Sequence, residues 1–174
     1  MGCISANKAT LAGRLSNQES VILMSGGAAE ALHAHPGVFK LAIQHRKGFI
    51  RLALESGAQM VPVLGFGEND LFDTVYLGGS TGNGSNGSNK ESDSPSLLWK
   101  TQRGLYKWLK FSLPLWFHFY ARPGPVTVVV GAPVEFPKDA TVDECHGIYL
   151  KQVEALYNEH KHKYGHKDVP LEFC

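Results

Sequence analysis

A glycine pair followed by a carboxylate is the first place in this sequence where residue types and spacing could do chemistry. Gly26 and Gly27 follow the apolar run Val21–Met24 after a single serine, and Glu30 lies just beyond them. Glycines at a tight turn let backbone amides approach a substrate closely, and N–H groups can stabilise an oxyanion. A nearby carboxylate can orient a basic group. The same residues also fit an ordinary turn with a solvated glutamate, so both interpretations stay open.

Further charged residues follow within the next forty positions. Arg46 and Lys47, with Arg51, could donate charge-assisted hydrogen bonds to phosphate groups, or could be solvated helix charges. Glu68 stands in the segment Phe-Gly-Glu-Asn-Asp (66–70), where it is as consistent with a structural role as with a catalytic one.

Other pattern matches do not predict a site. The strings Gly-Gly-Ser-Thr-Gly (78–82) and Gly-Asn-Gly-Ser-Asn-Gly (82–87) fit hydrolase and dinucleotide patterns, but both lie in a Gly-, Ser- and Asn-rich stretch. Each chemistry needs a strand before and a helix after the glycines. His160, His162 and His166 lack metal-ligand spacing and are expected to be solvated, so no metal site is predicted.

Strands and a helix must position the residues around Glu30. Val21–Met24 is expected to be a buried strand, and alternation over 39–43 predicts a half-buried one. A helix is expected over Arg46–Ser56, with Gly57 at its end. A strand is expected over Met60–Phe66. Its proline has no N–H to donate, which places it at a sheet edge or at a strand end. This succession predicts an α/β sheet with right-handed crossovers.

The second half of the chain begins with a predicted insertion. Residues 78–96 have too few apolar side chains to offset the entropy of ordering and should form a flexible surface segment. An amphipathic basic helix is expected over 97–111, and an aromatic segment follows at 113–120.

Two further elements are expected near the end of the sequence. Val126–Val130 predicts a central strand covered on both faces. Thr141 and Glu144 form a capping-box pattern, which predicts a helix that ends near Gly165.

Composition sets broad bounds. The 174 residues, 43% of them hydrophobic, predict one domain over 1–174. Seventeen Lys and Arg nearly balance sixteen Asp and Glu, so no nucleic-acid partner is predicted. Three cysteines without paired spacing indicate reduced thiols. No apolar run approaches the roughly 20 residues that cross a bilayer, so any membrane attachment of this stretch is expected to be peripheral.

Several distinctive segments follow one another along the chain, namely Gly-Gly-Ala-Ala-Glu-Ala-Leu (26–32), His-Pro-Gly (35–37), Arg-Lys-Gly-Phe-Ile-Arg-Leu-Ala (46–53), Val-Pro-Val (61–63) and Phe-Gly-Glu-Asn-Asp (66–70). In this order they resemble the core of the type-two diacylglycerol acyltransferase family. Val-Val-Val-Gly-Ala-Pro (128–133), His146 with Tyr149, His160-Lys161 and Lys163–Gly165 resemble that family's carboxyl-terminal segment. The resemblance covers nearly the whole chain apart from 78–96.

The resemblance implies a partial glycerolipid-acyltransferase-like α/β sandwich. The implied enzyme transfers a fatty acyl group from acyl-CoA, a co-substrate, to diacylglycerol to make triacylglycerol, with no cofactor. The implied partners are acyl-CoA, diacylglycerol and a membrane surface, and a homo-oligomer is left open. The implied location is the cytosolic face of the endoplasmic reticulum membrane, and also lipid droplets.

Residue roles follow from the resemblance. The family's catalytic histidine lies in a His-Pro-His-Gly motif upstream of the glycine pair, and this chain contains no such motif. The stretch 33–37 differs from it in order, so His33 and His35 are weak candidates for the base. Glu30 would partner a histidine that is not in this chain. Gly26, Gly27, Arg46, Lys47 and Glu68 would contact substrate.

This chain lacks the histidine motif, and its first residues, Met1-Gly2-Cys3, resemble an interior segment of the family. Both features imply a carboxyl-terminal part of the enzyme that is inactive alone. Two other functions stay open. One is acyl transfer to a monoacylglycerol or a wax alcohol. The other is an inactive truncated fragment that binds lipid surfaces through the basic helix and the aromatic segment.

Overall fold

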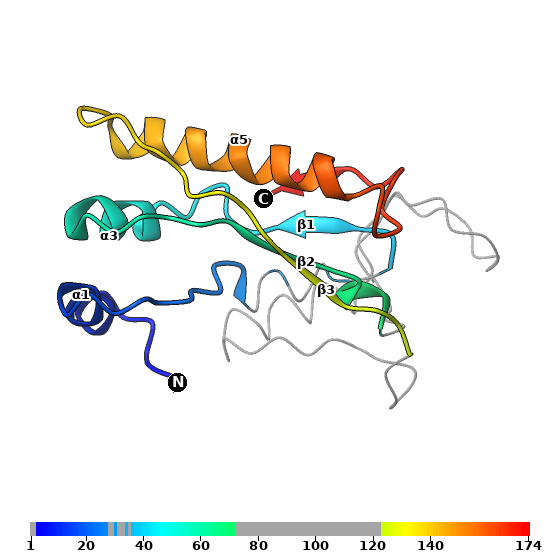
Figure 1. Ribbon diagram of the computed structural model, residues 1–174, viewed down its shortest axis with the longest axis horizontal. Coiled ribbons are helices and arrows are strands. Elements are labelled where there is room, and N and C mark those ends of the chain that lie inside the picture. The colour runs from blue at the N-terminus through cyan, green and yellow to red at the C-terminus, as the bar shows by residue number, and fades with distance from the viewer. Residues whose placement is uncertain (1–2, 28–29, 31–33, 35, 72–122) are drawn as a thin grey trace, which may run out of the picture.

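The computed structural model describes residues 3–27, 30, 34, 36–71 and 123–174 (Figure 1). The predicted insertion at 78–96, the basic helix at 97–111 and the aromatic segment at 113–120 lie outside the described residues. In the part described, helices and short strands occur together along the chain, which confirms the mixed α/β class.

Four strands of the described part form two pairs. β1 (Phe39–Leu41) pairs in parallel with β4 (Leu171–Phe173), with Phe39 opposite Leu171. β2 (Val63–Phe66) pairs antiparallel with β3 (Thr127–Val130). The strands predicted around 39–43 and 60–66 are therefore present but shorter. Met60 makes only an isolated bridge to Val134, and Pro62, which has no N–H to donate, precedes the ladder.

The hydrophobic core lies between these strands and the long helix α5 (Val142–His160), which runs along them in Figure 1. Phe66 and Tyr157 stack with ring centroids 5.7 Å apart. The Tyr157 hydroxyl donates to the Val169 carbonyl at 3.0 Å, and burial raises the pKa of Tyr157 to about 12, so the phenol stays protonated. The buried residues of this core are Phe39, Leu64, Phe66, Val129, Val153, Leu156 and Tyr157.

α5 begins as the sequence predicts. The Thr141 side chain accepts from the Glu144 N–H, and the Glu144 carboxylate accepts from the Thr141 N–H at 2.7 Å. This reciprocal arrangement is a capping box. The helix ends at His160 and not near Gly165, which follows a turn and has a left-handed φ of 83°.

Two shorter helices follow beside α5, one packed against the other. α3 (Gly48–Ser56) contacts α5 on one side and α1 (Lys8–Ser16) on the other (Figure 1). α3 confirms the helix predicted over 46–56, and Gly57 ends it with a φ of 65°. α1 was not predicted, although Asn7 caps it by accepting from the Thr10 N–H at 2.8 Å.

Two strand predictions are wrong. Val21–Met24 forms no strand, and Ile22 and Met24 are 78% and 87% exposed. β3 is not covered on both faces, since Val128 and Val130 are 61% and 65% exposed. Among the described strands β3 has only β2 as a neighbour, so one face of this two-stranded sheet packs on α5 and the other carries exposed valines.

Candidate functional site

Glu30 lies directly over the first glycine of the pair. A Cβ added at Gly26 would overlap the Glu30 carboxylate, so this close approach requires glycine. Gly27 has a left-handed φ of 57°, a backbone conformation that other residues rarely adopt. Both glycines therefore serve the local geometry that brings the carboxylate onto the backbone.

The Glu30 carboxylate is partly desolvated and incompletely satisfied. Burial raises the pKa of Glu30 above its usual range, although a hydrogen bond from the Ala42 N–H and the charge of Arg46 both lower it. The nearby charge of Glu68 adds to the rise. Within the described part of the chain, the buried Oε1 atom of Glu30 has no hydrogen-bond partner. Among these residues, the carboxylate therefore has one acceptor that is not used.

Arg46 ties the glycine pair to the segment that leads into α3. Its Nη1 donates to the Ser25 carbonyl and lies 3.7 Å from where a Cβ on Gly27 would be. The Arg46 N–H donates to the Ile43 carbonyl at 3.1 Å, which holds the turn after β1. An arginine fixed in this way places positive charge beside Glu30.

Glu68 approaches the same place from the short 3₁₀ helix η1 (Glu68–Asp70). It is exposed, and its carboxylate packs against Gly65, 3.1–3.3 Å from where a Cβ would be. Asn69 donates to the Val38 carbonyl at 2.9 Å, so η1 is joined to the residue before β1. Gly26, Gly27, Glu30, Arg46 and Glu68 are hereafter called the Glu30 cluster.

Lys47 is directed elsewhere. Its Nζ lies 2.8 Å from the Asp143 carboxylate in the first turn of α5, and this hydrogen bond and charge lower the pKa of Asp143. Of the substrate-contacting residues predicted from the sequence, the structure therefore groups Arg46 and Glu68 with Glu30 but not Lys47. Both partners of the Lys47 ion pair are largely exposed, so the pair contributes little to stability.

Two histidines that sequence reasoning did not single out for a role are buried. His146 on α5 has its Nε2 3.0 Å from the Ile43 carbonyl, which links α5 to the turn before Arg46. His166 was predicted to be solvated, but it is only 4% exposed because it packs edge-on against Phe39 and beside Phe66. Its Nε2 lies 3.7 Å from Asp70 Oδ2. His33 and His35 lie outside the described residues.

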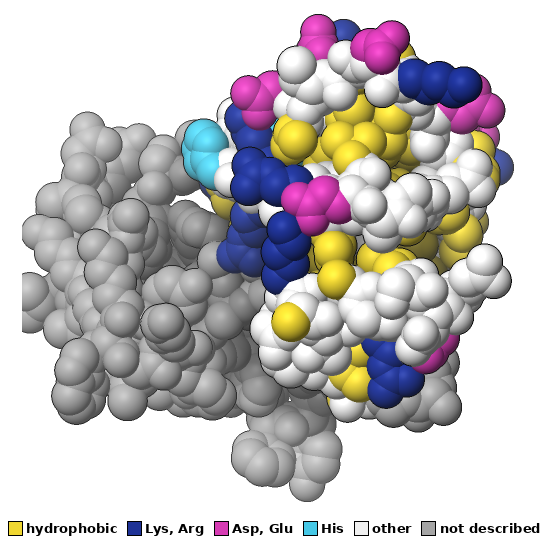
Figure 2. All heavy atoms as spheres, turned by 90° about the vertical axis from the view of Figure 1, so that its left-hand side faces the viewer, with side chains coloured by type: hydrophobic (Ala, Val, Ile, Leu, Met, Phe, Trp, Pro, Cys, Tyr) yellow, Lys and Arg dark blue, Asp and Glu magenta, His cyan; other side chains and the backbone are white. Residues whose placement is uncertain are grey.

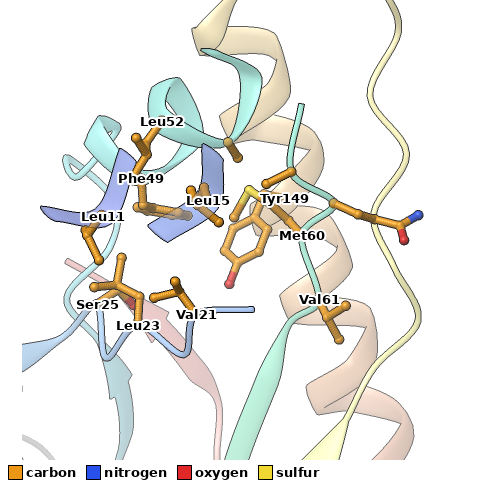
Figure 3. A pocket seen from close by; sticks show the side chains of 13 residues that line it. Leu11, Leu15, Val21, Leu23, Ser25, Phe49, Leu52, Met60, Val61 and Tyr149 are labelled. Carbon is orange, nitrogen blue, oxygen red and sulfur yellow. The ribbon is translucent and has the colours of Figure 1, made fainter. Parts of the chain in front are cut away.

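An apolar groove of about 160 Å³ opens beside the Glu30 cluster (Figure 3). α1, the segment 21–25, α3, the segment 58–61 and α5 each contribute to its wall. Val21 and Leu23 line it, although Leu23 is still 39% exposed, whereas the neighbouring Ile22 and Met24 are not part of the lining and are more exposed. On the face shown in Figure 2, hydrophobic side chains line hollows between the stacked layers, and Lys and Arg gather beside them.

Two other features are absent from the part of the chain that the structure describes. Among the described residues, no three His, Cys, Asp or Glu side chains come together to hold a metal ion. Within the same ranges, no helix combines the length and hydrophobicity that a bilayer crossing requires.

Comparison with known proteins identifies the family. The family model described as "Diacylglycerol acyltransferase" covers residues 1–174. Human "2-acylglycerol O-acyltransferase 1" is 36% identical over 95% of this chain and 50% of its own length. Human "2-acylglycerol O-acyltransferase 3" is 38% identical, over 90% of this chain and 45% of its own. "Diacylglycerol O-acyltransferase 2A" of Umbelopsis ramanniana is 32% identical, over 88% and 44%.

This chain thus spans about half the length of the curated relatives that it matches. No solved structure matches it significantly. The resemblance found in the sequence is confirmed, and the chain belongs to the diacylglycerol acyltransferase family.

Proposed function

We propose that this chain serves an acyl-CoA-dependent O-acyltransferase that esterifies the free hydroxyl of an acylglycerol, with diacylglycerol as acceptor and triacylglycerol as product. The observation that carries the proposal is family membership over residues 1–174, and the Glu30 cluster lies within the stretch 26–70, whose segments resemble the core of that family. The proposed fold is the α/β sandwich of the glycerolipid acyltransferases.

The proposed chemistry needs a base, an activated carbonyl and a positioned acceptor. A histidine supplied from outside this chain takes the proton of the acceptor hydroxyl, whose oxygen bonds to the thioester carbon. The tetrahedral oxyanion then collapses, the carbon–sulfur bond breaks, and the proton passes to the CoA thiolate. No cofactor takes part. Backbone N–H groups near Gly26 and Gly27 are the proposed oxyanion donors.

Glu30 is proposed to orient that histidine. Its buried Oε1 has no donor within the described residues, and so it can accept from an imidazole N–H. The charge of Arg46 favours the ionised form of the carboxylate. Arg46 is also proposed to meet substrate phosphate, and Glu68 to contact substrate at the edge of the cluster. Lys47 is proposed to contact substrate only when its ion pair with Asp143 is broken.

A second acceptor is favoured by a specific observation. The relatives named 2-acylglycerol O-acyltransferase are 36–38% identical to this chain, whereas those named diacylglycerol O-acyltransferase are 32–33% identical. Transfer to a 2-acylglycerol, giving diacylglycerol, is therefore the alternative. Wax-alcohol transfer has no such support.

The proposed location is the cytosolic face of the endoplasmic reticulum membrane, with lipid droplets as a second site. The proposed partners are acyl-CoA, the acylglycerol and a membrane surface. Chemical cross-linking of the full-length protein would test whether it also forms a homo-oligomer.

Product analysis tests the proposal. Membranes that contain the full-length protein receive radiolabelled oleoyl-CoA with diacylglycerol, 2-acylglycerol and a long-chain alcohol in competition. We expect label in triacylglycerol, and label mainly in diacylglycerol would support the alternative. Label in wax ester alone, or none above membranes with the Glu30→Gln variant, would contradict both.

A further inference from the structure

The apolar groove is suited to hydrocarbon. Its lining contains no Asp, Glu, Lys, Arg or His side chain, and its polar members are Ser25, Gln59 and Tyr149. Burial raises the pKa of Tyr149, so the phenol in the wall is uncharged. Clefts lined mainly by apolar side chains can take up the apolar part of a ligand.

The groove and the Glu30 cluster adjoin at Ser25. Ser25 lines the groove, its carbonyl accepts from Arg46, and Gly26 with the Glu30 carboxylate above it comes next in the chain. A ligand whose tail lies in the groove would therefore place its polar end at the cluster. This arrangement suits a long-chain lipid whose reacting group is at one end.

The size of the groove limits how much of such a ligand it can hold. At about 160 Å³ it is close to the roughly 150 Å³ cavities that bind benzene. It can therefore hold about six carbons, which is a segment of a fatty chain and not the whole of it.

We propose that the apolar groove holds part of the fatty acyl chain that is transferred, and that Leu15 and Ala58 set how much chain fits. This inference rests on the proposed acyl transfer. The transferred chain is chosen over the acceptor's chains because the names of the relatives share acyl transfer while their acceptors differ. Leu15 on α1 and the half-buried Ala58 after α3 stand in different walls of the groove.

Two filling variants test the inference from separate walls. Ala58→Leu and Leu15→Trp each add bulk to the groove, so that misfolding of one leaves the other informative. The matched control is Ala155→Leu, which adds the same three carbons at an exposed position of α5. Each is made in the full-length protein, and activity is divided by protein abundance.

The measurement is kcat/KM over acyl-CoA donors of 4 to 18 carbons at one acceptor, repeated over acceptors of several chain lengths at one donor. A methylene that loses its burial costs about fourfold in binding, so displacing two of them costs on the order of tenfold. A butanoyl chain is shorter than the groove and loses little when the groove is filled, so we expect each filling variant to lower the ratio of octadecanoyl to butanoyl transfer by about tenfold. Ala155→Leu should leave the ratio unchanged, and the acceptor preference should not move.

Other outcomes separate the two proposals. An unchanged donor ratio in both filling variants, or a shift in acceptor preference instead, would overturn the groove assignment while acyl transfer stood. If the wild-type protein transfers no acyl group, the proposed function fails and photo-crosslinking decides the groove. A palmitoyl-CoA analogue with a diazirine in its chain should then label the peptides around Leu15 and Leu23. No label there would overturn the inference, as expected if protein fills the groove.

Discussion

Several features that rarely occur together in a purely structural glutamate coincide at Glu30. Its carboxylate is partly desolvated, has a raised pKa, touches the backbone at Gly26 and retains a buried oxygen without a donor among the described residues. A buried polar atom left unpaired costs free energy, so its persistence is informative. These features are consistent with the role that the residue pattern and the resemblance suggested for Glu30, and that role stays a prediction.

The first prediction concerns the charge of this side chain. Glu30→Gln in the full-length protein should lower acyl transfer per molecule by roughly 10²-fold or more, because a neutral amide holds a histidine base less well. Protein abundance should change little, since glutamine fits the same space. Radiolabelled acyl-CoA assays with quantitative immunoblots provide the measurement. The control is Glu19→Gln, which removes an exposed ion pair with Arg14; equal effects of both variants would count against the role.

The second prediction tests the contact between Gly26 and Glu30. Gly26→Ala should displace the carboxylate, because the added Cβ would occupy its position. Activity should fall as in Glu30→Gln, and the double variant should fall no further, since both changes remove one interaction. Additive losses in this double-mutant cycle would show that Gly26 acts separately. Gly13→Ala is the control, because a Cβ there meets nothing within 4 Å.

Among the elements, α5 has the most local support. Its capping box lies within four residues and should form in a peptide of residues 138–165. Hydrogen bonds from Thr141 lower the pKa of Glu144, so the stabilisation is present above the usual pKa of a glutamate and is lost as pH falls through the lowered value.

The third prediction follows from the lowered pKa of Glu144. Peptide helicity, measured by circular dichroism, should decrease between about pH 5 and pH 3, and Glu144→Gln should reduce this decrease. Glu154→Gln, in the exposed middle of the helix, should leave it largely intact. Thr141→Ala should cost the helix about 1 kcal/mol. Identical pH profiles for the wild-type and Glu144→Gln peptides would refute the assignment.

The elements also show what could be predicted from the sequence. The cap at Thr141, the end of α3 at Gly57 and the strand at Phe39 depend on neighbouring residues and are confirmed. Whether both faces of β3 are buried, and whether Val21–Met24 forms a strand, depends on segments distant in the chain. The local pattern of apolar residues carries no information about those segments.

The same distinction holds for the candidate site. The resemblance brought Glu30, Arg46 and Glu68 into consideration, but nothing local indicated that Lys47 would pair with Asp143. The burial of His166 likewise arises from Phe39 and Phe66, which lie about a hundred residues earlier.

At the scale of the whole molecule, this chain spans about half the length of its relatives. The fourth prediction is that residues 1–174, expressed alone in a host without triacylglycerol synthesis, transfer no acyl group. Co-expression with the amino-terminal half of human 2-acylglycerol O-acyltransferase 1 should produce labelled acylglycerol, and Glu30→Gln should abolish it. Activity of residues 1–174 alone would contradict the proposal that the base lies outside them.

The pairing of β1 with β4 has a consequence for the timing of synthesis. β1 leads into the turn that holds Arg46, and its hydrogen-bonded neighbour among the described strands is about 130 residues later. At ribosomal rates of roughly 5–20 residues per second, β4 follows β1 by on the order of ten seconds. During that interval the strand beside the Glu30 cluster has an open edge. The nascent protein therefore passes through a stage in which that edge can pair with another strand.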